Sequence, residues 1–324
     1  MSHYNTAGPG AIVFSVAAAI AMIAATTFFM PPLHPGAEFG VCFSFPYNWL
    51  TGLQGVAVNT FLIAVAILMA SLLNKKYSFV KGADSVLPVA MCILLASNPA
   101  NTSCFDISVI MLIVNLICLE ILMRSYCSAN ATTQMFAIAT YLSLGSMVEC
   151  GFIPFIILYP VMALMMKAFR IKELLAYLMG LVAPYWVALG FGLVEFSDFR
   201  IPQLLSVADV ADGDFNFFVY LSLGCMALVG LMMTLNNALL FYKGNIRVRT
   251  FNNVINLLGV LCTVCMIVDF ENFGAYVSTF CFAVSVQIAN FFAIRNIPHS
   301  DRWFWGLLSF FILLYLLMLV ESFI

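Results

Sequence analysis

The chain has 324 residues, of which 64% are hydrophobic and only 9% are charged. Its mean hydropathy is +1.05, and its formal net charge is −2. A soluble globular protein has about a quarter of its residues charged, so a chain of this composition could not cover its own surface in water. The composition therefore excludes a soluble enzyme and a nucleic-acid-binding module, and it predicts a polytopic membrane protein.

Apolar segments recur along the whole chain, and a bilayer core requires about 20 apolar residues of helix. The sequence therefore predicts an all-α transmembrane bundle, a single integral membrane domain over residues 1–324, with nine to eleven spans and a best count of eleven. The expected spans are about 11–30, 50–73, 85–97, 107–123, 134–148, 152–169, 174–195, 216–241, 252–268, 274–294 and 303–321. The third and the fifth are short, so each is expected to be tilted, re-entrant or extended by less apolar flanks.

The basic residues test this helix count. When alternate loops are assigned to the same side, twelve of the 13 Lys and Arg residues share one side: Lys75, Lys76, Lys81, Arg124, Lys167, Arg170, Lys172, Lys243, Arg247, Arg249, Arg295 and Arg302. Cytoplasmic loops carry an excess of Lys and Arg. The N-terminus is therefore predicted to be cytoplasmic and the C-terminus to lie outside. Eleven of the 15 acidic residues then fall on the outer side.

The first long outer loop, about residues 31–49, contains four prolines, several aromatic residues, His34 and Glu38. Proline fixes φ and lowers the entropic cost of holding a loop in one conformation. Aromatic rings beside polar groups suit a sugar or a lipid headgroup at the membrane interface. The alternative is a stiff loop that covers the outer surface and has no ligand.

The second long outer loop, about residues 196–215, contains Arg200, the one basic residue on the outer side. Arginine binds phosphate groups bidentately, so Arg200 is a candidate to bind a polyprenyl phosphate or another anionic headgroup. The alternative is a local ion pair with Asp198 or Glu195.

Two further carboxylates are expected at the outer ends of spans. Asp106 follows a polar turn in which Asn101 adds hydrogen-bonding capacity, and it is either the N-cap of the fourth span or a functional carboxylate. Glu149 lies beside a tight turn between two apolar helices, where an ionised side chain is costly unless it is used. The candidate catalytic residues are thus Glu38, Asp106 and Glu149, and the candidate ligand- or phosphate-binding residues are Arg200, His34 and Asn101.

Motifs for nucleotides and metals are absent from the sequence. There is no P-loop and no G-x-G-x-x-G, G-x-S-x-G or H-E-x-x-H motif. The three histidines are dispersed, and Cys262 and Cys265 lie within an apolar span, where cysteine acts as a small hydrophobic residue. We therefore expect no nucleotide site, no metal site and no cofactor.

Four features follow one another between Met135 and Leu193. They are a small-residue turn at 145–151, a Phe- and Pro-rich helix at 152–169, a short basic link at 170–173 and a Gly-Leu-x-x-Pro-Tyr stretch at 180–185. Together they resemble a family of multi-pass inner-membrane proteins found mainly in Bacteroidetes-type bacteria. The resemblance implies location in the bacterial cytoplasmic (inner) membrane and carries no activity with it.

The overall layout is more distantly similar to GT-C-type glycosyltransferases and O-antigen-polymerase-like membrane proteins. That resemblance implies work on lipid-linked sugars at the outer face. The sequence departs from it in the first outer loop, where Glu38 stands alone and GT-C enzymes often carry an acidic pair or a well-defined Asp. It departs also in having no large outer acceptor domain.

Three functional hypotheses follow from the sequence. The chain acts on lipid-linked glycans or polyprenyl-phosphate carriers at the outer face; or it is a non-enzymatic scaffold subunit of a membrane complex; or it transports a small solute or lipid. Whether it is an enzyme stays open at this point. The expected partners are the lipid bilayer and either a lipid-linked sugar or another membrane protein, and neither nucleic acid nor a nucleotide is expected.

Overall fold

The computed structural model describes residues 8–30, 40–43, 52–80, 85–103, 105–195, 197, 199, 217–241, 245–269, 272–294 and 300–322. These residues form eleven α-helices and no β-strand, which confirms the predicted all-α bundle. The helices are α1 (Pro9–Phe29), α2 (Gly52–Tyr77), α3 (Val86–Ala96), α4 (Ile107–Arg124), α5 (Thr132–Val148), α6 (Ile153–Met165), α7 (Ile171–Gly190), α8 (Phe217–Phe241), α9 (Ile246–Val268), α10 (Phe273–Ile294) and α11 (Ser300–Glu321). Two 3-10 turns, η2 (Pro99–Asn101) and η3 (Cys150–Phe152), precede α4 and α6.

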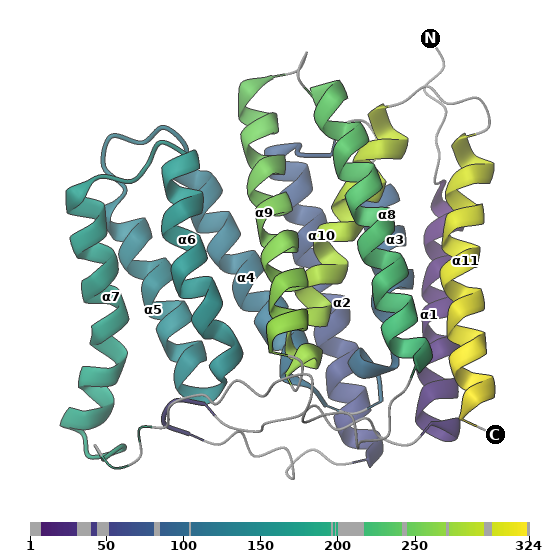
Figure 1. Cartoon of the computed structure of the whole chain (residues 1–324), viewed down its shortest axis with the longest axis horizontal. Coiled ribbons are helices and arrows are strands. Elements are labelled where there is room, and N and C mark those ends of the chain that lie inside the picture. The colour runs from purple at the N-terminus through teal and green to yellow at the C-terminus, as the bar shows by residue number, and fades with distance from the viewer. Residues whose placement is uncertain are drawn as a thin grey trace.

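Eight of the described helices are long and apolar enough to cross a membrane, so the chain is a multi-pass membrane protein. Helices α1 and α11 both run from the upper end of the bundle to the lower end in Figure 1, as an odd number of crossings requires. The three shorter helices are α3, α5 and α6, with 11, 17 and 13 residues. An 11-residue helix rises only about 16 Å, so α3 alone cannot cross a hydrocarbon core of about 30 Å.

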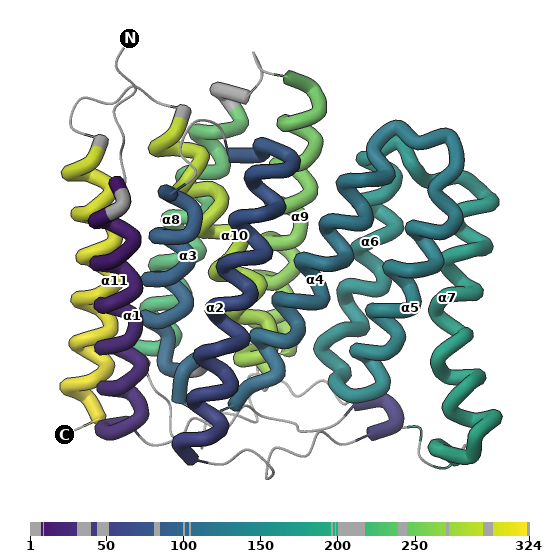
Figure 2. The backbone as a smooth tube through the Cα atoms, turned by 180° about the vertical axis from the view of Figure 1, so that it is seen from behind, coloured from purple at the N-terminus to yellow at the C-terminus, as the bar shows by residue number. Residues whose placement is uncertain are grey.

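Helix α10 lies in the middle of the bundle, and α3, α4, α8 and α9 pack against it (Figures 1 and 2). Its most apolar window is 94% buried, whereas the windows of the other seven long helices are 22–61% buried. Polar residues on α10 therefore meet protein and not lipid. Gln287 Oε1 accepts a hydrogen bond from Asn237 of α8 (2.9 Å), and Asn290 donates to Asn252 of α9 (2.6 Å).

Both connections of the short helix α3 are held by buried amide side chains. On the predicted cytoplasmic side, the Asn74 Oδ1 accepts from the Val80 amide (2.8 Å), and the Asn252 Nδ2 donates to the Phe79 carbonyl (3.0 Å). A backbone segment without helical hydrogen bonds needs such partners when no water is present. The third span is thus a short helix whose flanks are packed inside the protein.

Glu120 and Arg124, which stand four residues apart on α4, form an ion pair at 2.9 Å, and Lys76 of α2 contacts the same carboxylate at 2.8 Å. All three side chains lie at the predicted cytoplasmic ends of their helices. They are well exposed, so this group adds little to stability.

Helices α5, α6 and α7 form one edge of the bundle, and α4 lies between them and the centre (Figure 1). Helices α5 and α7 pack closely because Gly180 of α7 faces the Phe136 carbonyl and Ala139 of α5. The Ser143 hydroxyl of α5 donates to the Leu181 carbonyl of α7 at 2.7 Å. A small residue and an interhelical hydrogen bond are typical of membrane helix pairs.

We expect Gly180→Ala to destabilise the protein, because the added Cβ would lie 2.5 Å from the Phe136 carbonyl oxygen and 2.8 Å from the Ala139 Cβ. Overpacking of this kind costs about 1–3 kcal/mol. The measurement is thermal stability in detergent, followed by size-exclusion chromatography. Gly190→Ala on the same helix is the control, since nothing lies within 4 Å of its Cβ position; equal stability of the two variants would contradict the close α5–α7 packing.

The predicted orientation is tested at Cys127, which is exposed in the α4–α5 connection on the basic side. A membrane-impermeant maleimide should label this thiol in inverted vesicles and not in intact cells. The Cys127→Ser variant identifies the signal from this residue. A Cys127-dependent signal in intact cells would reverse the orientation derived from the positive charges.

Candidate functional site

The turn between α3 and α4 lies inside the bundle, and fully buried Asn101 is its central residue. The Asn101 side chain donates to the Leu95 carbonyl of α3, and its backbone carbonyl accepts from the Asn59 side chain of α2. Its Oδ1 accepts from the hydroxyl of Ser278 in α10 (3.0 Å) and from that of Ser108 in α4 (3.3 Å). Asn101 thus joins four helices of the bundle, three of them through its side chain and α2 through its backbone carbonyl.

The same turn is tied to the first and last helices. The Thr102 hydroxyl donates to Thr26 of α1 at 3.5 Å, and the hydroxyls of Thr26 and Tyr315 of α11 lie 2.9 Å apart. The Tyr315 hydroxyl also donates to the Met22 carbonyl at 2.7 Å. Polar groups therefore extend from the turn to α1 and α11.

Asp106 stands at the N-cap of α4, as the sequence predicts, with an extended backbone (φ −129°, ψ 142°). It is 0% exposed, and its side chain makes no capping hydrogen bond. Neither carboxylate oxygen makes a hydrogen bond of good geometry with a described residue. Burial raises the pKa of Asp106 from 3.8 to about 6, and the Ser108 hydroxyl and the amides of Ile107 and Ser108 oppose the rise. The carboxylate is thus desolvated without full compensation. We call Asn59, Asn101, Asp106, Ser108 and Ser278 the α3–α4 cluster.

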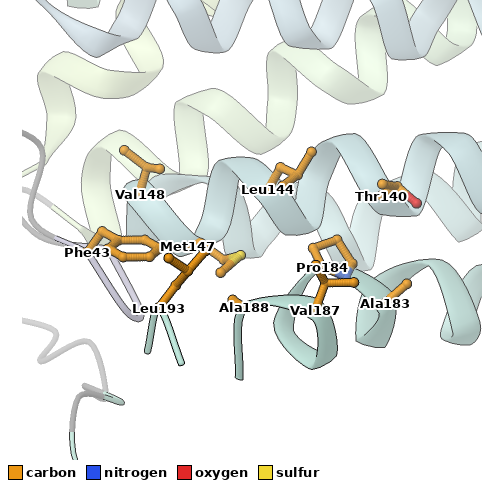
Figure 3. Close-up of a pocket in the computed structure, with 10 residues that line it drawn as sticks. All are labelled: Phe43, Thr140, Leu144, Met147, Val148, Ala183, Pro184, Val187, Ala188 and Leu193. Atoms are coloured by element: carbon orange, nitrogen blue, oxygen red, sulfur yellow. The ribbon is translucent and has the colours of Figure 1, made fainter. Parts of the chain in front are cut away.

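Glu149 lies at a second place, at the C-terminal end of α5, and is 2% exposed. The two residues before it, Met147 and Val148, line a groove of about 430 Å³ between α5 and α7 (Figure 3). The other lining residues are Phe43, Thr140, Leu144, Ala183, Pro184, Val187, Ala188 and Leu193. The groove is therefore almost wholly apolar along its length, and Glu149 follows its lining residues in the chain without lining it.

Polar groups and a backbone segment border the outer end of this groove. The hydroxyls of Ser146 and Tyr185 lie 2.8 Å apart, which joins α5 to α7. The amide of Val41 donates to the Ser146 carbonyl at 3.0 Å, and that of Phe43 to the Met147 carbonyl at 2.9 Å. Residues 40–43 are thereby fixed against the end of α5, and the Phe43 ring covers the groove there (Figure 3).

The structure brings Asn101 and Asp106 together in the α3–α4 cluster and places Glu149 apart from them, at the C-terminal end of α5. The other three predicted site residues, His34, Glu38 and Arg200, lie outside the described residues. The predicted outer loops 31–49 and 196–215 fall largely outside them as well. Among the described residues, no group of three or more His, Cys, Asp and Glu side chains is arranged to hold a metal ion.

Sequence reasoning missed Ser108 and Ser278. Both are fully buried, and their hydroxyl oxygens lie 2.9 Å apart although 170 residues separate them in the chain. A serine inside an apolar helix usually donates to its own helix backbone, so its type carries no signal for a site. Only the packing of α4 against α10 reveals the pair.

No protein-family description matches this chain, and no curated protein matches its sequence significantly. The inner-membrane family and the GT-C-like layout therefore stay expectations from the sequence.

We expect Asn101→Ala to destabilise the protein by about 2–4 kcal/mol, because a buried amide side chain that bonds to three helices is lost and its partners are left unsatisfied. The control is Asn236→Ala, since Asn236 donates to the Met232 carbonyl within its own helix. Thermal unfolding in one detergent gives the comparison. If the two variants unfold at the same temperature, Asn101 does not organise the turn.

Proposed function

We propose that this chain acts on lipid-linked glycans or on polyprenyl-phosphate carriers at the outer face of the membrane. The observation that carries the proposal is the apolar groove between α5 and α7, two of whose lining residues, Met147 and Val148, directly precede the buried Glu149 in the chain. A substrate with a long apolar tail and a polar head needs this combination of surfaces.

The tail would lie in the groove. Binding sites for small ligands have volumes of about 300–1,000 Å³ and are mostly apolar, with a few polar groups that fix orientation. The α5–α7 groove, at about 430 Å³, lies within this range. Because α5 and α7 form the edge of the bundle, a lipid tail could enter from the bilayer without passing through the protein (Figure 1).

The head would lie at the outer end of the groove, near Ser146, Tyr185 and Glu149. Hydroxyl groups and a carboxylate can bind sugar hydroxyls, and a carboxylate can accept a proton from an attacking hydroxyl as a general base. Glu38 stands two residues before Gly40 in the sequence, and Gly40 packs directly against the backbone of Met147 and Val148. We therefore include Glu38 as the second carboxylate of the proposal.

The phosphate would be bound by Arg200, the one basic residue on the predicted outer side, with His34 as a further polar contact. Arginine offers two parallel N–H groups to a phosphate. Because the other charged residues on the predicted outer side are acidic, Arg200 is the main positive group there.

Transport is a second candidate function, and the α3–α4 cluster favours it. Broken helices whose ends meet at a buried polar site are common in secondary transporters. Helix α3 is short, buried and followed by a polar turn, and Asp106 at that turn is 0% exposed.

The lipid-carrier proposal predicts that Ala183→Phe, which fills the groove, reduces the polyprenyl phosphate that co-purifies with the protein. An overpacking cost of about 1–3 kcal/mol corresponds to a loss of about five- to 150-fold. The measurement is mass spectrometry of lipids retained in nanodiscs. The matched control is Ala57→Phe in a second apolar groove of similar volume, about 400 Å³, between α1 and α2. Equal lipid retention in both variants, or none in the unmodified protein, would overturn the proposal.

Glu149→Gln should keep the lipid and lower the output of envelope glycan by about 10²–10⁴-fold, the usual contribution of a general base. Arg200→Ala should instead lose the retained lipid. Full glycan output from the alanine variants of Glu38, Asp106, Glu149 and Arg200 would rule out an enzymatic role for the outer face.

A further inference from the structure

Three oxygen–oxygen contacts in the α3–α4 cluster share only two hydroxyl protons. Three oxygens form a triangle: Asn101 Oδ1 to Ser278 Oγ is 3.0 Å, Asn101 Oδ1 to Ser108 Oγ is 3.3 Å, and the two hydroxyl oxygens are 2.9 Å apart. Each hydroxyl has one proton, and an amide oxygen has none to donate. Two protons cannot serve three contacts at once, so one edge of the triangle has no hydrogen between its oxygens.

The Asp106 carboxylate adds two more acceptor oxygens at the same place. It lies beside Ser108, whose hydroxyl and amide lower the cost of its charge. Neither of its oxygens makes a hydrogen bond of good geometry with a described residue, and the residue is 0% exposed. A buried ionisable side chain in a membrane protein marks an ion or substrate site by default.

The helix ends around the cluster do not supply the missing positive charge. The N-terminus of α4 is positive, but the C-terminal end of α3, which is negative, meets the same cluster through the Leu95 carbonyl. The two ends oppose each other.

We infer that Asp106, Asn101, Ser108 and Ser278 bind one sodium ion. Hard cations prefer oxygen ligands, and carboxylate, amide and hydroxyl oxygens are what this cluster offers. One carboxylate balances one positive charge, whereas a divalent ion would leave a buried net charge. The short distances within the oxygen triangle favour Na⁺ over the larger K⁺. This inference does not depend on the proposed action on lipid carriers.

The test uses the purified full chain in nanodiscs, with NaCl replaced by KCl or choline chloride at constant ionic strength. Radioactive ²²Na⁺ should bind with a stoichiometry of one per chain, and Tm should rise with Na⁺ concentration, since a ligand of the native state stabilises it. Choline should have no such effect, and K⁺ a smaller one. Absence of Na⁺ binding to the unmodified protein, or equal effects of K⁺ and Na⁺, would overturn the inference.

Variants assign the site. Asp106→Asn should abolish Na⁺ binding, and Ser278→Ala should weaken it at least about tenfold. The matched control is Ser285→Ala, because Ser285 is a fully buried serine of the same helix whose hydroxyl donates to the Cys281 carbonyl (2.7 Å); its Na⁺ affinity should be unchanged. If Asp106→Asn does not fold, the difference in Na⁺ affinity between Ser278→Ala and Ser285→Ala tests the site. Undiminished Na⁺ binding in Ser278→Ala, or stabilisation by acid without any effect of Na⁺, would overturn the site.

Discussion

The break after α3 imposes the main physical constraint on this structure. Backbone groups that leave a helix inside a membrane protein must find partners within the protein, because hydrocarbon offers none and each unsatisfied group costs several kcal/mol. Asn101 meets this need on the outer side of α3 through its side chain and its carbonyl. Asn74 and Asn252 meet it on the cytoplasmic side. The short helix is possible because buried amides hold both of its flanks.

The same constraint explains the position of α10. Its side chains provide partners at two depths: Ser278 reaches the turn after α3, and Gln287 and Asn290 bond to α8 and α9 nearer the cytoplasmic side. Interhelical hydrogen bonds of this kind contribute about 0.6–2 kcal/mol each in membranes. Several of them on one helix favour a position where every face meets protein, and α10 has that position.

Much of the architecture could be predicted from the sequence, because span length and charge bias are set by the bilayer. The all-α bundle, the short third span and the local pair Glu120–Arg124 needed only composition and spacing. The site could be predicted only in part. Asp106 and Asn101 stand close together in the sequence and are strongly polar, so the sequence identified them as candidate site residues. It could not identify Ser278, because the role of Ser278 depends on the packing of α10 against α4.

The groove between α5 and α7 could not be predicted from the sequence, for a different reason. Its lining comes from α5, α7 and Phe43, and each residue alone is an ordinary apolar residue of a membrane helix. The relevant signal was the packing of Gly180, which brings the two helices together where Ser143 bonds across them. Toward the outer end, the Ser146–Tyr185 bond joins the helices again, and the groove lies along this pair.

The groove and the α3–α4 cluster occupy environments that suit different ligands. A lipid tail must enter from the bilayer, so its site has to lie on helices at the edge of the bundle, as α5 and α7 do. A buried carboxylate is best placed where protein surrounds it, because lipid contact would add the full desolvation cost of the charge. Asp106 begins α4, the helix that packs against α5 on one side and against α10 on the other. A shift of α4 that followed ion binding at its first turn would therefore act on the packing of α5, whose end carries Glu149.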